Sequence, residues 1–317
     1  MPTREISSLN VVAIAGGVGG AKLADGLAQA LSPGKLSVIV NIGDDFDHLG
    51  LRICPDLDTV CYTLAGLANP TTGWGRAGET WQAMENLALL GGPTWFRLGD
   101  MDLATHLERT QRLTRGERLS EITHGFCRAW GITSQVFPVT DDPVPTIVHA
   151  DEGDLPFQEY FVRRQCNPRV KRFSFEDVSL ASPAPGVLDA LTTADLVVFC
   201  PSNPWVSIDP ILAVPGIREV IREKHVIAVS PLIGGKAVKG PAAKMYAELG
   251  VAPTAYAVAA HYQELLSDFV FDNVDAAQEA DVRKLGVRSF VTDTLMHTPL
   301  DRKRLAEEVL RMAITAS

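Results

Sequence analysis

The chain begins with alternating apolar runs and helical patterns, an order typical of a βαβ unit. Residues 10–15 form a short apolar run, residues 16–20 are rich in glycine, and residues 21–31 place leucines four positions apart. A second apolar run follows at 36–41. The apolar runs indicate buried strands and the leucine spacing indicates a helix. Strand, turn, helix and strand in this order predict a parallel sheet.

The rest of the chain repeats this rhythm around a long helical stretch. Residues 59–130 are mainly helical in pattern, with a glycine-rich break at 73–78. Further strands are expected at 195–200, 226–229, 255–259 and 289–291, and a closing helix at 300–314. We therefore expect one α/β domain over residues 1–317: a Rossmann-like, mostly parallel sheet flanked by helices, with a largely helical insertion at about 59–130.

Polar or glycine-rich segments follow four of the predicted strands. They span residues 16–20, 41–45, 201–204 and 230–235. Ligands of open α/β sheets bind beyond the carboxyl ends of the strands. We therefore expect these four segments to converge on one site.

Composition narrows the classes of partner. The net charge of −9 gives no general affinity for nucleic acid, so an anionic substrate must be held by local groups. No apolar run reaches the roughly 20 residues of a membrane helix, and residues 1–10 lack the pattern of a signal peptide. We expect a cytoplasmic location and no membrane partner. The five cysteines are scattered and form no C-x-x-C pair, which favours buried, reduced thiols.

The first glycine turn is a candidate phosphate site. Gly16, Gly17, Gly19 and Gly20 allow close approach of the backbone, the helix that follows offers free N–H groups, and Lys22 adds a charge. The string matches neither the dinucleotide fingerprint nor the Walker loop. A tight turn without a ligand is the alternative.

Four carboxylates follow the second strand and are candidate magnesium ligands. They are Asp44, Asp45, Asp56 and Asp58. Magnesium binds through one or two carboxylates together with substrate phosphates and water. Asp58 also fits a helix N-cap, because a helical pattern opens at Thr59.

With these strings in view, the chain resembles the 2-phospho-L-lactate transferase family, including its phosphoenolpyruvate-using bacterial branch, from about residue 11 to 296. The resemblance is carried by residues 16–23 (GGVGGAKL), 41–45 (NIGDD), 55–60 (PDLDTV), 97–106 (RLGDMDLATH), 140–144 (TDDPV), 157–160 (FQEY), 201–204 (PSNP) and 230–236 (SPLIGGK). One departure is Val18-Gly19-Gly20, where family members often carry Thr-Gly-Thr. The departure removes hydroxyl groups but leaves the backbone cradle.

The resemblance implies a reaction and its partners. The expected enzyme moves a phospho-organic acid from a guanosine diphosphate-linked, GTP-derived donor to the deazaflavin alcohol Fo, releases GMP and requires Mg²⁺. The product is the tail-less form of coenzyme F-420. A homodimer is the family expectation. No residue decides between phospholactate, phosphoenolpyruvate and phosphoglycerate.

Roles follow for individual residues. Phosphoryl transfer depends on positioning and neutralisation of charge, so we expect Mg²⁺ on Asp44, Asp45 or Asp58 and a carboxylate that accepts the proton of the attacking hydroxyl. Asp58 is our first choice for that base and Asp56 our second. The resemblance places Fo contacts at Asp58 and Arg97. Binding of the donor is expected at Ser202, Asn203, Ser230, Gly234 and Gly235.

Several residues near these strings keep two interpretations. Asp141 and Asp142 fit either guanine recognition or a turn before Pro143, and Lys236 and Lys239 fit either phosphate contacts or solvated positions. His106 fits a structural helix position, and Trp74 is the tryptophan that best fits a ring platform.

Two other classes of protein compete with this assignment. A related family of regulators binds nucleotide sugars without catalysis, but it should lack the 97–106 string and the Asp-Leu-Asp pair at 56–58. A nicotinamide-dependent dehydrogenase is disfavoured because Lys22 stands where its fingerprint needs glycine or alanine.

Overall fold

The computed structural model describes residues 5–237 and 240–314. Its centre is a seven-stranded sheet in the order β14-β13-β10-β9-β1-β2-β5, and all neighbouring strands are parallel. The strands are β1 (Val11–Ala15), β2 (Leu36–Val40), β5 (Gln135–Pro138), β9 (Leu196–Phe199), β10 (Val226–Val229), β13 (Asp268–Asp272) and β14 (Arg288–Thr292). The Rossmann-like parallel sheet that the sequence predicts is therefore confirmed.

The direction of winding reverses between β1 and β9. The chain moves outward from β1 through β2 to β5, then returns to the other side of β1 and continues from β9 to β14. Such a switch point leaves a crevice at the carboxyl ends of the two central strands. β1 and β9 are buried along their whole length, so the crevice stands on a fully buried part of the core.

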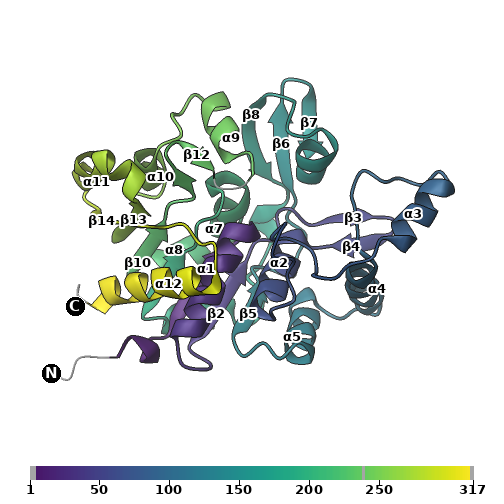
Figure 1. Ribbon diagram of the computed structural model, residues 1–317, viewed down its shortest axis with the longest axis horizontal. Coiled ribbons are helices and arrows are strands. Elements are labelled where there is room, and N and C mark those ends of the chain that lie inside the picture. The colour runs from purple at the N-terminus through teal and green to yellow at the C-terminus, as the bar shows by residue number, and fades with distance from the viewer. Residues whose placement is uncertain (1–4, 238–239, 315–317) are drawn as a thin grey trace.

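Helices flank the sheet. α1 (Gly17–Ala30) and α12 (Pro299–Ile314) pack side by side over one face, visible as the purple and yellow helices of Figure 1. α1 also packs against α2 (Pro55–Leu64). The remaining α-helices of the later half are α6 (Val187–Thr193), α7 (Asp209–Ala213), α8 (Ile217–Arg222), α9 (Ala242–Glu248), α10 (Ala255–His261) and α11 (Glu279–Lys284). Short 3-10 and π turns lie at η1 (Ile6–Ser8), η2 (Glu159–Arg163), η3 (Val178–Leu180), η4 (Pro204–Ile208) and η5 (Asn273–Gln278).

Between β2 and β5 the chain leaves the sheet and forms a lateral lobe. The lobe holds a hairpin of β3 (Phe46–His48) and β4 (Leu51–Ile53), then α2, α3 (Gln82–Leu89), α4 (Asp100–Thr114) and α5 (Leu119–Ala129). Its outer part, with β3, β4, α3 and α4, lies on the right of Figure 1, whereas α2 lies beside α1. We call residues 46–130 the insertion.

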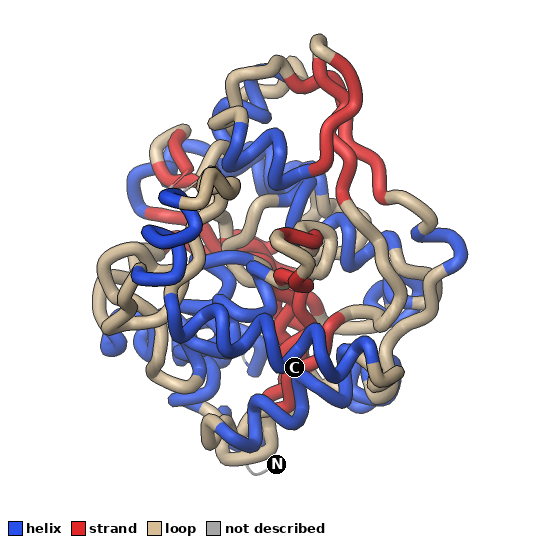
Figure 2. The backbone as a smooth tube through the Cα atoms, turned by 90° about the vertical axis from the view of Figure 1, so that its right-hand side faces the viewer, coloured by secondary structure: helices blue, strands red, loops and turns tan. Residues whose placement is uncertain are grey.

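A second lobe rises beside the insertion. It is an antiparallel sheet of β6 (Thr146–Ala150), β7 (Gly153–Pro156) and β8 (Val170–Phe175) in the order β7-β6-β8. Figure 2 shows its strands projecting at the top of the molecule. A small hairpin of β11 (Leu232–Ile233) and β12 (Lys236–Ala237) follows β10.

The structure corrects several predicted elements. Residues 255–259 are helical in α10 rather than a strand, because Thr254 caps the first turn by accepting from the Ala257 N–H and the following residues are mostly alanine. The β3–β4 hairpin, the β6–β8 sheet, and β5 and β13 of the central sheet were not predicted. β13 carries aspartates at both ends, which hid its buried centre.

The two helices that matter most for the site begin earlier than predicted. α1 begins at Gly17 rather than 21, so most of the glycine turn is the first turn of a helix. α2 begins at Pro55 rather than 59, with Cys54 at the N-cap position. Asp58 is therefore inside the helix and not its cap. The five cysteines are free and buried, as predicted. Within the described residues, no helix combines the length and the apolarity needed to cross a membrane.

Candidate active site

A cavity of about 800 Å³ opens at the switch point between the sheet edge, the insertion and the β6–β8 lobe. All four predicted segments contribute to its lining. The predicted site residues that line it are Gly16, Gly17, Gly19, Lys22, Asp44, Asp56, Asp58, Arg97, Ser202, Asn203 and Ser230. Those outside the lining are Gly20, Asp45, Gly234 and Gly235.

The glycines at the start of α1 are required first by tight packing. A Cβ atom at Gly16 would lie 2.5 Å from Asp56 Oδ2, and one at Gly19 would lie 2.2 Å from the carbonyl oxygen of Pro201. Gly17 has a φ of +61°, a conformation that favours glycine. The N-cap residue of α1 makes no side-chain cap hydrogen bond, and the N–H groups of the first turn have no partner within the helix. Of these groups, the Gly17 N–H donates to the Asp56 carboxylate, and the residues of this turn line the cavity.

The polar residues after β9 and β10 mainly shape the backbone. The Ser202 hydroxyl accepts from the Gly16 N–H at 3.1 Å and donates to the Gly16 carbonyl at 2.7 Å. Asn203 accepts from the Trp205 N–H, and the Ser230 hydroxyl closes a local turn with Leu232. Ser202 and Ser230 thus fix the rim of the cavity.

Gly234 and Gly235 have a structural role in the β11–β12 hairpin. Both have positive φ, as a two-residue hairpin turn requires, and the Gly234 N–H donates to Asp275 at 2.8 Å. The hairpin brings Ile233 and Ala237 to the cavity instead. Lys236 is exposed, and Lys239 lies outside the described residues.

Asp56 and Asp58 point to different sides of the cavity. Residues two positions apart on a helix are separated by about 200° of rotation about its axis. Asp56 turns toward the sheet edge, where it accepts from Asn41 Nδ2 at 2.9 Å and lies against Gly16 and Gly17. Burial raises the pKa of Asp56 to about 6, although the hydrogen bonds from Asn41 and the Gly17 backbone lower it.

Asp58 turns toward the insertion and pairs with an arginine that sequence analysis missed. Both oxygens of the Asp58 carboxylate accept from the guanidinium group of Arg109, a residue of α4 that is 1% exposed. His106 lies one turn earlier on α4, with Nδ1 3.7 Å from Asp58 Oδ2 and 3.2 Å from Arg109 Nη1. The sequence did carry a signal for Arg109: it follows His106, the last residue of the 97–106 string, by three positions, so the two side chains lie on one face of a helix.

Asp44 has the properties of a cation ligand. Its Oδ1 atom is buried without a hydrogen-bond partner and its side chain lines the cavity. Gln158 donates to its backbone carbonyl at 3.2 Å and to Oδ2 at 3.4 Å. Burial raises the pKa of Asp44 well above its usual value, and the neighbouring charges of Asp56 and Asp45 raise it further. A cation beside Asp44 would relieve both effects.

Asp45 lies deeper and faces Arg52. Both of its carboxylate oxygens are buried without a hydrogen bond, and Arg52 Nη2 is 3.7 Å from Oδ2. Burial raises the pKa of Asp45 to about 7, against the charge of Arg52. Among the described residues, no three His, Cys, Asp or Glu side chains converge as a self-sufficient metal site. The donor set fits Mg²⁺ that completes its shell with phosphate and water, with Asp44 as the best-placed protein ligand.

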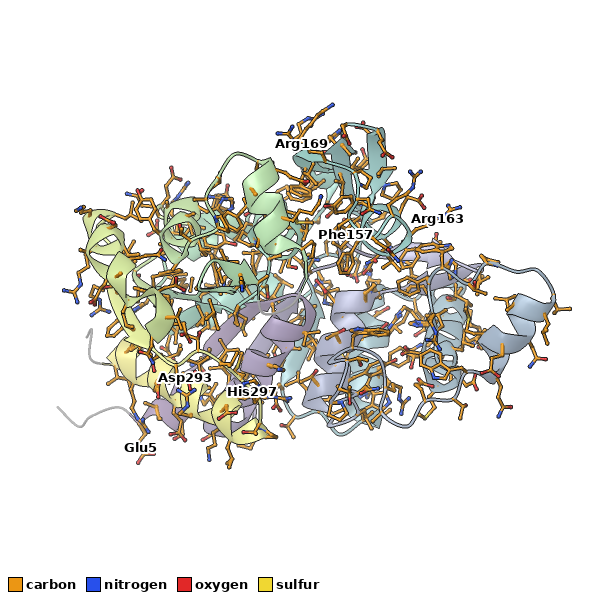
Figure 3. The ribbon with its side chains drawn as sticks, turned by 45° about the horizontal axis from the view of Figure 1, so that its top comes forward. Glu5, Phe157, Arg163, Arg169, Asp293 and His297 are labelled. Atoms are coloured by element: carbon orange, nitrogen blue, oxygen red, sulfur yellow. The ribbon has the colours of Figure 1, made fainter. Side chains whose placement is uncertain are left out.

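The insertion supplies an aromatic wall. Arg97 is exposed and stacks on Trp81, with Cζ 4.2 Å from the ring centroid. Trp74, at 48% exposure, and Trp95 also line the cavity. On the opposite side Phe157 and Phe161 form a stacked pair with centroids 5.4 Å apart; Figure 3 shows Phe157 between the two lobes. These rings offer flat apolar surfaces on both sides of the cavity.

Acidic residues of the other motif strings stabilise loops. Asp100, the first residue of α4, accepts from the first N–H groups of α3, and Glu79, in the loop before α3, accepts from those of α4. Asp141 accepts from the Ser120 N–H and hydroxyl, and Asp142 accepts from the Ser182 N–H. Neither Asp141 nor Asp142 lines the cavity, which favours the turn interpretation over guanine recognition.

The fold and the cavity define a doubly wound α/β protein with a glycine-rich helix N-terminus and an aromatic wall at its switch point. The family model of 2-phospho-L-lactate transferase CofD matches residues 11–311. The chain belongs to this family of transferases.

Individual relatives agree with that assignment. The chain is 44% identical over 313 residues to a phosphoenolpyruvate transferase of Streptomyces griseus, covering 96% of this chain and 98% of the relative. It is 38% identical over 300 residues to a 2-phospho-L-lactate transferase of Methanosarcina barkeri, covering 95% and 97%. A solved structure of a UPF0052 family protein from Bacillus halodurans shares the fold, with a TM-score of 0.61 at 16% identity over 96% of this chain and 99% of the other.

Proposed function

We propose that this protein transfers a phospho-organic acid, 2-phospholactate or phosphoenolpyruvate, from a guanosine diphosphate-linked donor to the deazaflavin alcohol Fo. The reaction would release GMP and belong to coenzyme F-420 biosynthesis. The observation that carries the proposal is that a single cavity joins the start of α1 to an aromatic wall. The names of the curated relatives, phosphoenolpyruvate transferase and 2-phospho-L-lactate transferase, support the group transferred.

The donor is proposed to bind along the sheet edge. The start of α1 offers backbone N–H groups and the positive end of a helix dipole, which suits a diphosphate. Lys22 lines the same part of the cavity, and its Nζ donates to the Met296 carbonyl at 2.7 Å. That bond holds the ammonium group near the glycine residues at the start of α1, where its positive charge would offset the negative charge of the donor's phosphates.

Magnesium is proposed as the cofactor, held by Asp44 with Asp45 and Asp58 as the other predicted ligands. The unpaired Oδ1 atom of Asp44 supports this assignment, whereas both oxygens of Asp58 already accept from Arg109. Bound Mg²⁺ would neutralise charge on the transferred phosphoryl group. Loss of turnover in excess chelator, and its return on adding Mg²⁺, is the expected result.

Asp56 is the proposed base, and Asp58 with Arg97 the proposed contacts of Fo. Asp56 lies against Gly16 and Gly17, next to the proposed phosphate cradle, so it is near the phosphorus that the hydroxyl attacks. Asp58 is on the side of the aromatic wall. The geometry thus favours Asp56 over Asp58 as the base, the reverse of the order proposed from the sequence.

We further propose that the protein forms a homodimer and is located in the cytoplasm.

The test is to incubate the protein with Fo, a guanylated phospho-acid and Mg²⁺, and to follow GMP by chromatography. We expect GMP to be released only when all three are present. Release without Fo would indicate hydrolysis instead of transfer. Binding of the donor without any release would favour a non-catalytic nucleotide-binding regulator.

A further inference from the structure

Arg109 fixes the protonation pattern of the His106 ring. An arginine side chain only donates hydrogen bonds, and Arg109 Nη1 is 3.2 Å from His106 Nδ1. His106 Nδ1 must therefore accept, which leaves the proton of the neutral ring on Nε2. Which nitrogen carries the proton is set by the partner of the other one.

The other ring nitrogen of His106, Nε2, makes no hydrogen bond within the part of the chain that the structure describes. Within residues 5–237 and 240–314, the hydrogen bonds and ion pairs of His106 all run through Nδ1. The residue is nevertheless part of the cavity lining, although only 3% of its side chain is exposed. His106 Nε2 has no hydrogen-bond partner among the described residues, yet it is not one of their fully buried unpaired atoms, so it is reachable from the cavity. A ligand in the cavity can supply the acceptor that this N–H donor lacks.

The surroundings of His106 indicate which kind of acceptor. Asp58 and Asp102, both cavity-lining, lie on the same side, and Asp102 accepts from the Tyr62 hydroxyl at 2.7 Å. Arg109, the cation that contacts His106, already pairs with both oxygens of Asp58 and is not free to hold a phosphate here. The rings of Trp74 and Trp95 line the same wall. A planar ring that carries a carbonyl oxygen matches this combination of apolar surface and neutral donor.

We propose that His106, held as the Nε2–H tautomer by Arg109, donates a hydrogen bond to a ring carbonyl of the acceptor. This inference rests on the proposed function, because it takes the acceptor to be the deazaflavin ring of Fo. Arg109 acts through His106 and Asp58 and is a positioning residue. The donor substrate, bound at the sheet edge, gains nothing from His106.

Two amide substitutions separate the two ring nitrogens. Asparagine in His106→Asn places its Oδ1 near the position of Nδ1, so it keeps the contact with Arg109 but loses the donor into the cavity. Glutamine in His106→Gln reaches the position of Nε2 but gives up the contact with Arg109. We expect His106→Asn to keep the melting temperature and to weaken Fo binding about tenfold to a hundredfold, the effect of leaving one polar group unpaired. His106→Gln should lower the melting temperature and keep Fo affinity within about threefold.

The measurements are calorimetric titration of Fo, the KM of the guanylated donor and a thermal melt for each variant. The proposal is supported if His106→Asn is the more stable variant but binds Fo more weakly, while His106→Gln is the less stable variant but binds Fo more tightly. If His106→Asn binds Fo as tightly as wild type, His106 is only an acceptor for Arg109 and the proposal is wrong. An equal rise in KM for both substrates would also contradict it.

The tautomer can be tested without any ligand. Two-bond ¹H–¹⁵N correlation spectra of the free protein distinguish the two nitrogens, and we expect a protonated Nε2 and a bare Nδ1 for His106. A protonated Nδ1 would overturn the argument even if Fo binds. If wild type does not bind Fo at all while Nε2 is protonated, the proposed acceptor has failed instead, and with it this role for His106.

Discussion

Asp56 and Asp58 stand two residues apart on α2, yet they belong to two different walls of the cavity. The wall around Asp56 is made of backbone: Gly16 and Gly19 approach other atoms so closely that no side chain fits. The wall around Asp58 is made of side chains, among them Arg109 and His106. A backbone wall suits the phosphates that every donor of this type shares, whereas a side-chain wall suits selection of one acceptor.

The difference also bears on how each wall tolerates change. A methyl group at Gly19 would collide with the Pro201 carbonyl, which is part of the main chain and cannot move aside as a flexible side chain can. On the other wall, side chains such as Arg97 and Trp74 are exposed and can be replaced without disturbing the sheet. Substitutions on the two walls should therefore affect different kinetic constants.

The largest effect is expected for Asp56→Asn. The amide cannot accept the proton of the attacking hydroxyl, so kcat should fall about 10²–10⁴-fold, the usual loss for a general base. Affinity for Fo, measured by titration, should change little because Asp56 faces the other wall. Normal turnover by a folded Asp56→Asn protein would remove Asp56 from the mechanism and return Asp58 to first place.

Asp58→Asn should lower the stability of the fold and weaken the binding of Fo. It leaves the buried guanidinium of Arg109 without its charge partner, and breaking such a pair costs about 3–5 kcal/mol. A denaturant titration should show that loss, and steady-state kinetics at a temperature where the variant is folded should show a raised KM for Fo. Arg109→Lys is the matched control, since it keeps the charge but cannot bond both oxygens of Asp58 at once. The same profile with the KM of the donor raised instead would mean that the walls are assigned the wrong way round.

Lys22→Ala should weaken binding of the donor but not of Fo, which tests the proposed separation of the two walls from the donor side. One charge-assisted contact contributes about 1.5–3 kcal/mol, so donor affinity should fall roughly tenfold to a hundredfold while Fo affinity stays the same. The side chain also donates to the Met296 carbonyl, so Lys22→Gln serves as a control that can keep this bond without the charge. Equal losses for both substrates in calorimetry would count against a wall dedicated to the donor.

Arg97→Ala is expected to have the smallest effect. Arg97 stacks on Trp81 at the exposed mouth of the cavity, and an exposed interaction of this kind contributes about 0.5–1 kcal/mol. The KM of Fo should rise a few-fold with kcat at saturating Fo unchanged. Trp81→Ala should have a similar effect, because it removes the ring that orients Arg97. A fall in kcat without a change in KM would contradict a binding role.

Sequence analysis predicted the sheet and the convergence of four segments because both follow from local patterns. Apolar runs ending in polar or glycine-rich turns mark strands, and parallel strands bring their carboxyl ends to one edge. The β6–β8 lobe escaped prediction because its outer strand β7 is largely exposed and β8 carries the exposed residues Lys171 and Arg172 instead of an apolar run. Arg109 escaped because its role depends on burial against Asp58, a contact between residues 51 positions apart.

The glycines show the limit of motif analysis most clearly. Gly16, Gly17 and Gly19 were predicted as phosphate contacts and do line the cavity, but each is also needed for a close approach or a positive φ. Gly234 and Gly235 were predicted as donor contacts and instead form a hairpin turn. In both segments close packing or a positive φ accounts for glycine, so the residue type by itself could not indicate a ligand.

The most direct test of the proposed transfer is mass spectrometry of the products formed from Fo with each of three guanylated donors, carrying phospholactate, phosphoenolpyruvate or phosphoglycerate. We predict a new species with the mass of Fo joined to the phospho-acid, formed together with an equal amount of GMP and most abundant for one of the three acids. Unchanged Fo with all three donors, in the presence of Mg²⁺ and a folded protein that binds them, would contradict the proposed reaction.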